Sequence, residues 1–220
     1  MLYQNITREQ LVMIVSAAVQ KALAGRQRTV PVGISVRHIH LSRADMDRLF
    51  GRNTDLTPRK KLSQPGQFAA EECVDVIGPK GTLHKVRVLG PLRGHTQVEL
   101  AQTDCRTIGV DAPVRASGDL QGTPGLALRG PLGEIAIPSG VIVADRHIHL
   151  SAAQGRAYGL ADGDRVRVSI GGIKPGTMDN VLVRCGDQHE MDFHIDTDDG
   201  NAFQLRQGQL VTILGKEETV

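Results

Sequence analysis

The chain contains the same histidine-rich hexapeptide twice. Residues 37–42 and residues 146–151 both have the sequence Arg-His-Ile-His-Leu-Ser. Side chains alternate between the two faces of a strand, so the two histidines of each copy lie on one face. They are His38 and His40 in the first copy, and His147 and His149 in the second. Two imidazoles on one face can share a metal ion, and zinc is the usual ion where there is no redox chemistry and no nearby cysteine pair.

An isolated His-x-His motif is weak evidence, because it can be two surface residues without a ligand. Two identical copies are stronger evidence, since core packing does not explain duplicated polar pairs. The repeat also indicates two related structural units that each present the same device. Each copy lies between an apolar strand and a helix, so its histidines stand at a strand end that is open to ligands.

A third segment of alternating polarity could complete one of these sites. Residues 190–196 read Glu-Met-Asp-Phe-His-Ile-Asp, which puts the acids and His194 on one face. Such a strand either faces solvent or lines a site. His194 could join one histidine pair and leave coordination positions open for substrate, which distinguishes a catalytic zinc from a structural one.

Three other features allow two interpretations each. Arg93 lies near a turn, where it is either a solvated loop residue or a clamp for phosphate. Glu99 sits between Val98 and Leu100, so it either faces water or ligates a metal. The glycine-rich residues 117–125 lack the lysine and the helix start of a phosphate-binding P-loop, and their composition predicts turns.

The rest of the chain predicts mainly short strands. Apolar residues make up 40% of the 220 residues and aromatic residues only 3%, while 25 glycines and 10 prolines favour tight turns. This pattern is typical of a sandwich or a barrel. Strands are expected at residues 30–36, 74–77, 83–89, 97–100, 134–137, 141–143, 166–170, 181–184, 191–195 and 209–214.

Three helices are expected among these strands. Residues 42–50 and 151–158 each begin with a serine suited to cap a helix. Residues 7–24 form an amphipathic pattern that starts at Thr7 and stops at Gly25. This N-terminal helix either packs on its own domain or a second subunit, or it is a docking peptide for another protein.

Composition argues against several classes of protein. The formal net charge is +2, so the charge does not indicate a nucleic-acid-binding protein. No apolar run approaches the ~20 residues of a membrane span. The three cysteines are far apart without a Cys-x-x-Cys pair, which argues against a disulfide framework and favours a reducing cytosolic compartment. Residues 1–25 lack the pattern of a secretory signal.

A set of motifs resembles one known family, the PduL-type phosphate propanoyltransferases, which are phosphotransacylases associated with bacterial microcompartments. The motifs follow one another in order over nearly the whole chain. They are residues 31–42, Gln64-Pro-Gly-Gln67, Gly90-Pro-Leu-Arg93, Thr96-Gln-Val-Glu99, residues 113–125, residues 140–149 and residues 194–202. One departure is Thr103-Asp-Cys105, where the family usually has Thr-Asp-Ala.

The resemblance implies a mainly β (α+β) fold with two β-barrel domains, capped by short helices, and an N-terminal amphipathic helix. The expected divisions are residues 1–29 for the helix and linker, 30–139 for the first barrel and 140–220 for the second. One zinc ion would be held by His38, His40 and Glu99, and a second by His147, His149 and His194.

The resemblance also implies the substrate contacts. Arg93 would bind phosphate, with Gln67 and Ser117 close to the reacting groups. Coenzyme A would contact Ser35, Lys60, Arg87, Leu89 and Asn201, together with His194. The reaction would be acyl-CoA + phosphate = acyl phosphate + CoA, with a propionyl or acetyl group.

For partners and location, the resemblance favours a homodimer or higher homo-oligomer in the bacterial cytoplasm, inside a microcompartment. The N-terminal helix would then dock on shell or core enzymes, and neither nucleic acid nor membrane would be bound.

Other functions remain open on the sequence alone. A metal-dependent hydrolase or thioesterase also uses His-x-His at a strand end, although the amidohydrolase barrel needs eight βα units and about 250 residues. A cupin would have a glutamate a few residues after its His-x-His, where this chain has Asp45 and Gln154. A non-catalytic metal-binding microcompartment protein would need no phosphate clamp.

Overall fold

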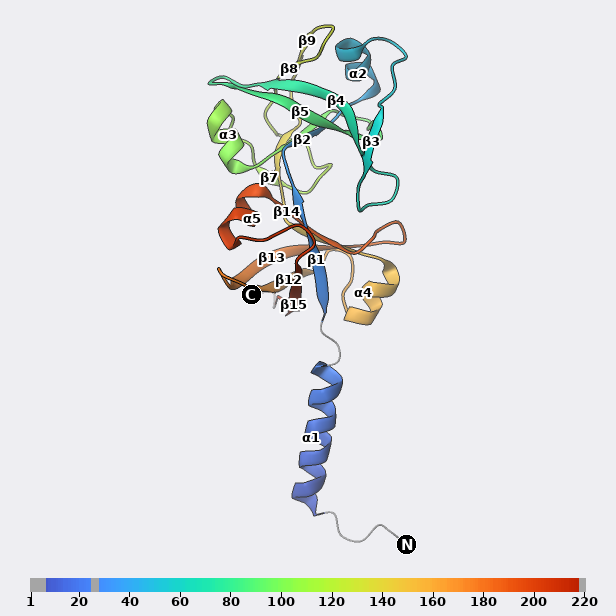
Figure 1. The fold of residues 1–220 in the computed structure, drawn as a ribbon, viewed down its shortest axis with the longest axis vertical. Helices are drawn as coiled ribbons and strands as arrows, with labels where there is room; N and C mark the ends of the chain where they lie inside the picture. The colour runs from blue at the N-terminus through green and yellow to red at the C-terminus, as the bar shows by residue number, and fades with distance from the viewer. Residues whose placement is uncertain (1–6, 25–27, 218–220) are drawn as a thin grey trace.

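The chain folds into two β units, one above the other, with a helix projecting from the lower unit (Figure 1). The computed structural model describes residues 7–24 and 28–217, except for the side chains of residues 17–24. A mainly β fold with two barrel-like units is therefore confirmed, although only one of the two sheets closes.

The lower unit is a closed six-stranded barrel with the strand order β1-β14-β11-β13-β12-β15. Its strands are β1 (Thr29–Ser35), β11 (His147–Leu150), β12 (Arg165–Ile170), β13 (Gly176–Cys185), β14 (Asp192–Asp196) and β15 (Leu210–Lys216). Apolar side chains that alternate along these strands fill the barrel, and Ile148, Phe193 and Val211 are buried among them. The barrel is thus a packed core that holds β11 and β14 side by side.

The upper unit is an open sheet with the strand order β7-β10-β6-β2-β5-β4-β8-β9, and β3 pairs with β4. Its strands are β2 (His38–His40), β3 (Pro58–Lys61), β4 (Phe68–Ile77), β5 (Thr82–Gly90), β6 (Gln97–Leu100), β7 (Val114–Arg115), β8 (Leu126–Arg129), β9 (Glu134–Ile137) and β10 (Val141–Ala144). A separate core that includes Ile39, Val98 and Leu128 packs this unit.

The division expected between residues 139 and 140 does not coincide with the sheets, because two strands are exchanged. β1 precedes the upper unit in sequence, yet it pairs with β14 and β15 of the barrel. β10 lies beyond residue 139, yet it pairs with β6 and β7 of the open sheet. The buried side chains follow these pairings: Val32 packs in the barrel core and Val143 in the core of the open sheet.

Both helices expected after the histidine motifs are present. They are α2 (Arg43–Phe50) and α4 (Ala152–Tyr158). The Ser42 and Ser151 hydroxyl groups each accept a hydrogen bond from a backbone N–H in the first turn, as N-cap residues do.

Two more helices, α3 (Gln102–Ile108) and α5 (Thr197–Phe203), were not predicted from the sequence. Each has seven residues and little apolar periodicity, so pattern analysis has no clear signal for it. An aspartate stabilises the start of each: Asp104 accepts from Ala101 N–H, and Asp196 accepts from Asp199 N–H.

The N-terminal helix α1 (Arg8–Ala24) begins after Thr7, as predicted, and Thr7 and Gln10 cap its start reciprocally. Residues 11–15, Leu-Val-Met-Ile-Val, are each between 52% and 67% exposed, and α1 stands apart from both sheets in Figure 1. The predicted stop at Gly25 lies outside the described residues. Within the described part of the chain, no helix combines the length and the apolar character needed to cross a membrane.

Candidate metal and substrate site

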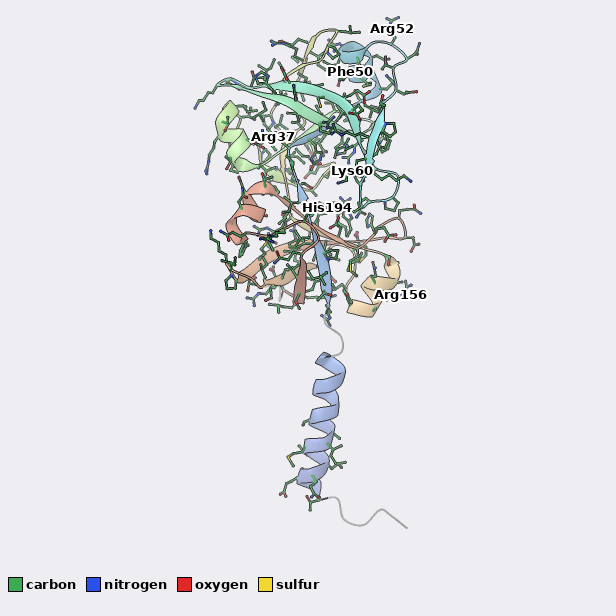
Figure 2. The ribbon with its side chains drawn as sticks, viewed as in Figure 1. Arg37, Phe50, Arg52, Lys60, Arg156 and His194 are labelled. Atoms are coloured by element: carbon green, nitrogen blue, oxygen red, sulfur yellow. The ribbon has the colours of Figure 1, made fainter. Side chains whose placement is uncertain are left out.

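A cavity of about 460 Å³ lies between the two units and is lined by residues of both. The upper unit contributes Lys60 and the lower unit contributes His194, which are labelled where the units meet in Figure 2. All but one of the predicted site residues line this cavity. They are Ser35, His38, His40, Lys60, Gln67, Arg87, Leu89, Arg93, Glu99, Ser117, His147, His149 and His194. Asn201 is the exception, since it lies exposed on α5 and does not belong to the lining.

The first donor set belongs to the open sheet and consists of His38, His40 and Glu99. β2 runs antiparallel to β6, and this pairing places His38 directly opposite Glu99. The Glu99 carboxylate lies 3.3 Å from His38 Nε2 and 3.9 Å from His40 Nε2. All three side chains are buried, so this carboxylate and these imidazoles converge inside the protein.

The second donor set belongs to the barrel and consists of His147, His149 and His194. The antiparallel pairing of β11 with β14 places His147 opposite His194, as His38 is opposite Glu99. The Nε2 atoms of His147 and His149 are 3.1 Å apart. Two nitrogens bound to one tetrahedral zinc ion at about 2.0–2.1 Å would be about 3.3 Å apart, so the observed spacing suits a shared ion.

The two sets use the same backbone contact to fix a histidine ring. His38 Nδ1–H donates to the carbonyl oxygen of Val36 at 2.9 Å, and His147 Nδ1–H donates to that of Asp145 at 2.8 Å. A carbonyl only accepts, so each neutral ring keeps its lone pair on Nε2, which faces the other donors. This is the tautomer and the orientation that a metal-binding histidine needs.

Buried polar atoms also indicate that the second set suits a metal ion. The Nε2 of His147 has no hydrogen to share, and His149 Nδ1 is buried with no hydrogen-bond partner among the described residues. Whichever nitrogen of His149 carries its hydrogen, one ring nitrogen has no suitable protein partner. An ion bound between the Nε2 atoms would account for their convergence.

Electrostatics keeps most of the imidazoles neutral. Burial, together with the neighbouring His38, lowers the pKa of His40 to about 3. Burial and the adjacent His194 lower the pKa of His147 to about 4, and burial and the other histidines lower that of His149 to about 2. Neutral imidazole is the form that binds a metal ion.

Glu99 reverses this effect on one histidine. Burial by itself would lower the pKa of His38, but the charge and the hydrogen bond of Glu99 raise it above its usual value. In return, although burial favours its protonated form, the charge and the hydrogen bond of His38 hold the pKa of Glu99 well below its usual range. The carboxylate therefore stays ionised and offers a negative oxygen to a cation.

Arg93 brings a positive charge to the same cavity. Its backbone N–H donates to Leu41 O at 2.9 Å, and its Nη1 donates to Ser117 Oγ at 3.1 Å. The Ser117 hydroxyl in turn donates to Glu99 Oε1 at 2.9 Å. A fixed guanidinium beside two donor sets can bind a tetrahedral oxyanion such as phosphate.

The rim of the cavity is basic on the side of the open sheet, where Lys60, Lys61 and Arg87 line it. Arg87 is held by the backbone of β4, since its Nη1 donates to the carbonyl oxygens of Ala70 and Glu71 at 2.9 Å each. A basic rim beside the apolar side chain of Leu89 suits a large polyanionic substrate.

Sequence reasoning missed some residues of the site. The buried Gln97 contacts the donor Glu99, and the buried Asp192 contacts the donor His194. Arg184 lines the cavity and is the cross-strand neighbour of His149. Alternation predicts that Asp192 lies on the polar face of its strand, but it predicts no role for this residue. Strand alternation could have indicated both contacts, since Gln97 and Asp192 each precede a donor by two residues and therefore lie on the same strand face as that donor.

Comparison with known proteins identifies relatives over most of the chain. The family model described as phosphate propanoyltransferase matches residues 31–206. A protein of Thermotoga maritima named phosphate propanoyltransferase is 47% identical over 193 residues, which cover 87% of this chain and 92% of the relative. Proteins of the same name from Rhodopseudomonas palustris and Salmonella typhimurium are each 49% identical, over 85% and 80% of this chain and 83% and 84% of the relatives.

Proposed function

The chain belongs to the phosphate propanoyltransferase family and is an acyltransferase, and from that premise we propose the details of its reaction. It transfers a propionyl or acetyl group between coenzyme A and inorganic phosphate at a centre that holds two zinc ions. The observation that supports this most directly is the convergence of two donor sets, five of whose six side chains are buried, and of Arg93 on one cavity between the units.

The two donor sets support a division of the ligands between two ions. His38, His40 and Glu99 hold one ion, and His147, His149 and His194 hold the other. Zinc bound at these positions would supply Lewis-acid chemistry, which would polarise the acyl carbonyl and favour a leaving thiolate. The second set contributes no charge, while the first contributes the carboxylate of Glu99.

The protein side chains orient the two substrates. Arg93, held by Ser117, binds phosphate and directs one of its oxygens at the thioester carbon. A carbon–oxygen bond forms, the carbon–sulfur bond breaks, and the electron pair leaves on the sulfur of coenzyme A. Lys60, Arg87 and Leu89 lie on the cavity wall where they can hold the coenzyme, with Ser35 on β1. Direct attack by phosphate needs no nucleophilic cysteine or serine.

Replacement of Arg93 tests the phosphate role. In Arg93→Ala, we expect the phosphate-dependent release of coenzyme A from propionyl-CoA to fall by a factor of about 100 or more, because a fixed charge on the attacking group is lost. The KM for phosphate should rise more than that for propionyl-CoA. The control is Arg129→Ala, since Arg129 is exposed and pairs with Glu134 away from the cavity. Full activity in Arg93→Ala would remove this residue from the mechanism.

The same assay separates the alternative functions. Thiol release that requires phosphate supports the transferase, whereas equal release without phosphate indicates a thioesterase or hydrolase. A protein that binds zinc but releases no thiol under either condition would be a metal-binding microcompartment protein without this activity.

We also propose that α1 docks this enzyme on a protein of a bacterial microcompartment. The observation that favours this is the exposed apolar run at residues 11–15, on a helix that stands apart from both sheets. Fusion of residues 1–28 to a fluorescent protein should then confer microcompartment localisation. A diffuse signal would overturn the docking proposal, and a fusion that only self-associates would indicate that α1 joins two copies of this chain.

A further inference from the structure

Each donor set has one member that is held by a polar side chain two residues earlier in the same strand. In the open sheet, Gln97 Nε2 donates a hydrogen bond to Glu99 Oε1. In the barrel, Asp192 Oδ2 accepts a hydrogen bond from His194 Nε2 at 3.0 Å. Gln97 is 1% exposed and Asp192 is 5% exposed, so both of these partners are buried, while the His194 side chain is 22% exposed.

The strand register shows that these two residues occupy equivalent positions. In the open sheet, His38 faces Glu99 and His40 faces Gln97 across the β2–β6 pair. In the barrel, His147 faces His194 and His149 faces Asp192 across the β11–β14 pair. The duplication seen in the hexapeptide therefore extends to the third donor and to its partner, although neither pair is identical in residue type.

The residue types differ in a way that preserves complementarity. Glu99 can only accept, and its partner Gln97 presents a donor. The amide orientation is fixed, because Gln97 Oε1 accepts from Gly118 N at 2.9 Å and Nε2 is left to face Glu99. His194 presents an N–H, and its partner Asp192 presents an acceptor, which leaves the His194 Nδ1 lone pair free.

The fold reserves space for the pair in the barrel. A Cβ atom added at Gly33 of β1 would lie 2.7 Å from Asp192 Oδ1 and 2.8 Å from His194 Cδ2. These separations are far shorter than ordinary van der Waals contact, so a side chain at position 33 would displace the aspartate and the histidine together. Gly33 lies directly beside His194 in the parallel pairing of β1 and β14.

We propose that Gln97 and Asp192 are positioning residues, each of which orients the third metal ligand of its own donor set. Gln97 does so as a hydrogen-bond donor and Asp192 as a hydrogen-bond acceptor. This inference rests on the metal centre proposed above. The requirement is a donor at position 97 and an acceptor at position 192. Two substitutions that preserve size should therefore differ in outcome: Asp192→Asn keeps an acceptor oxygen, whereas Gln97→Glu replaces the donor with a second carboxylate beside Glu99.

Metal retention tests the proposal without relying on activity. Zinc-loaded protein is titrated with a chromogenic chelator, the zinc content per chain is measured by mass spectrometry, and cobalt-substituted protein is examined by visible absorption. We expect Asp192→Leu and Gln97→Glu each to lower the affinity for one of the two zinc ions by a factor of about 10–100, as loss of a ligand's hydrogen-bond partner does. Asp192→Asn should keep both ions within about threefold of the original chain and preserve the cobalt spectrum.

The controls distinguish failure of the inference from failure of the metal centre. An unaltered chain that binds no zinc would overturn the proposed centre, and this inference with it. An unaltered chain that holds two ions while Gln97→Glu keeps both, or while Asp192→Asn loses one, would overturn the polarity argument alone. Glu190→Gln, with an exposed side chain near the start of the same strand, should change nothing. Circular dichroism checks the fold of Asp192→Leu, and if that variant misfolds, the two size-preserving substitutions decide the question.

Discussion

At the scale of single residues, the main chain orients two of the site histidines, and burial keeps His40, His147 and His149 neutral. The carbonyl oxygens of Val36 and Asp145 fix the tautomers of His38 and His147 through the same contact in both units. Burying neutral imidazole has a consequence for the protein without metal, because a buried ring resists protonation that the unfolded chain accepts freely.

The stability of the metal-free protein should therefore depend on pH. The pKa values of His40, His147 and His149 are lowered to about 3, about 4 and about 2, against about 6.5 for an exposed histidine. Below about pH 6.5 the unfolded chain binds protons that these folded rings do not, so the free energy of unfolding falls as the pH falls toward 4. Each group contributes at most about 1.4 kcal/mol per pH unit.

His38 has the opposite sign, because its pKa is raised in the folded chain. Its contribution is fully present below about pH 6.5 and is lost as the pH rises through its folded value, so it offsets only part of the effect of the other three. Urea unfolding of chelator-treated protein at pH 7, 6 and 5 measures the slope. The double variant His147→Asn/His149→Asn should show a shallower slope, and an unchanged slope would contradict the assignment.

At the scale of elements, the exchange of β1 and β10 determines which side chains meet. β1 follows α1 in sequence and is a strand of the barrel, where its pairing with β14 brings Gly33 beside His194. The same strand then leads directly into β2, which carries His38 and His40 in the other sheet. One continuous segment thus shapes the barrel donor set and supplies two of the three donors of the open sheet.

Gly33→Ala should disturb the barrel donor set. Gly33 does not adopt a positive φ, so the backbone tolerates alanine and the effect comes from lost space beside Asp192 and His194. We expect a loss of about 1–3 kcal/mol in the free energy of unfolding, as for other overpacked sites, and weaker binding of one zinc ion. Gly171→Ala is the matched control, since no atom lies within 4 Å of its added Cβ. Equal stability and zinc content in both variants would show that the pair can move aside without cost.

The elements themselves were largely predictable, whereas their pairing was not. Every strand expected from the short apolar runs between turn residues is present, whereas β3, β7 and β8 were not expected. Alternation does not say which strand lies next to which, and Val32 and Val143 have the same apolar pattern whichever core receives them. The site followed the same rule: the repeat indicated four histidines, while the roles of Gln97 and Asp192 depend on a register that only the folded sheets provide.

At the scale of the whole molecule, the cavity exists because the two units are held together around it. Besides the exchanged strands, the N-terminal ends of α3 and α5 meet through Thr103 N–H, which donates to Asp198 at 2.8 Å. A second contact between the units is made by the buried Gln64, whose side-chain amide both donates to and accepts from the backbone of Glu190. Its Nε2 donates to Glu190 O at 2.9 Å, and its Oε1 accepts from Glu190 N at 3.3 Å.

The Gln64 contact should couple the loop after β3 to the strand that carries Asp192 and His194. In Gln64→Leu, both backbone groups of Glu190 lose their partner, which we expect to destabilise the protein by about 1–3 kcal/mol. Hydrogen exchange at the Glu190 amide should become faster. Because Lys60, Gln64 and Gln67 all line the cavity, the KM values for the substrates should rise more than kcat falls. Gln121→Leu, at an exposed position, is the control. If exchange at Glu190 and both KM values stay at those of the unaltered chain, the two units keep their spacing without this contact, and the exchanged strands and the contact between α3 and α5 set the width of the cavity.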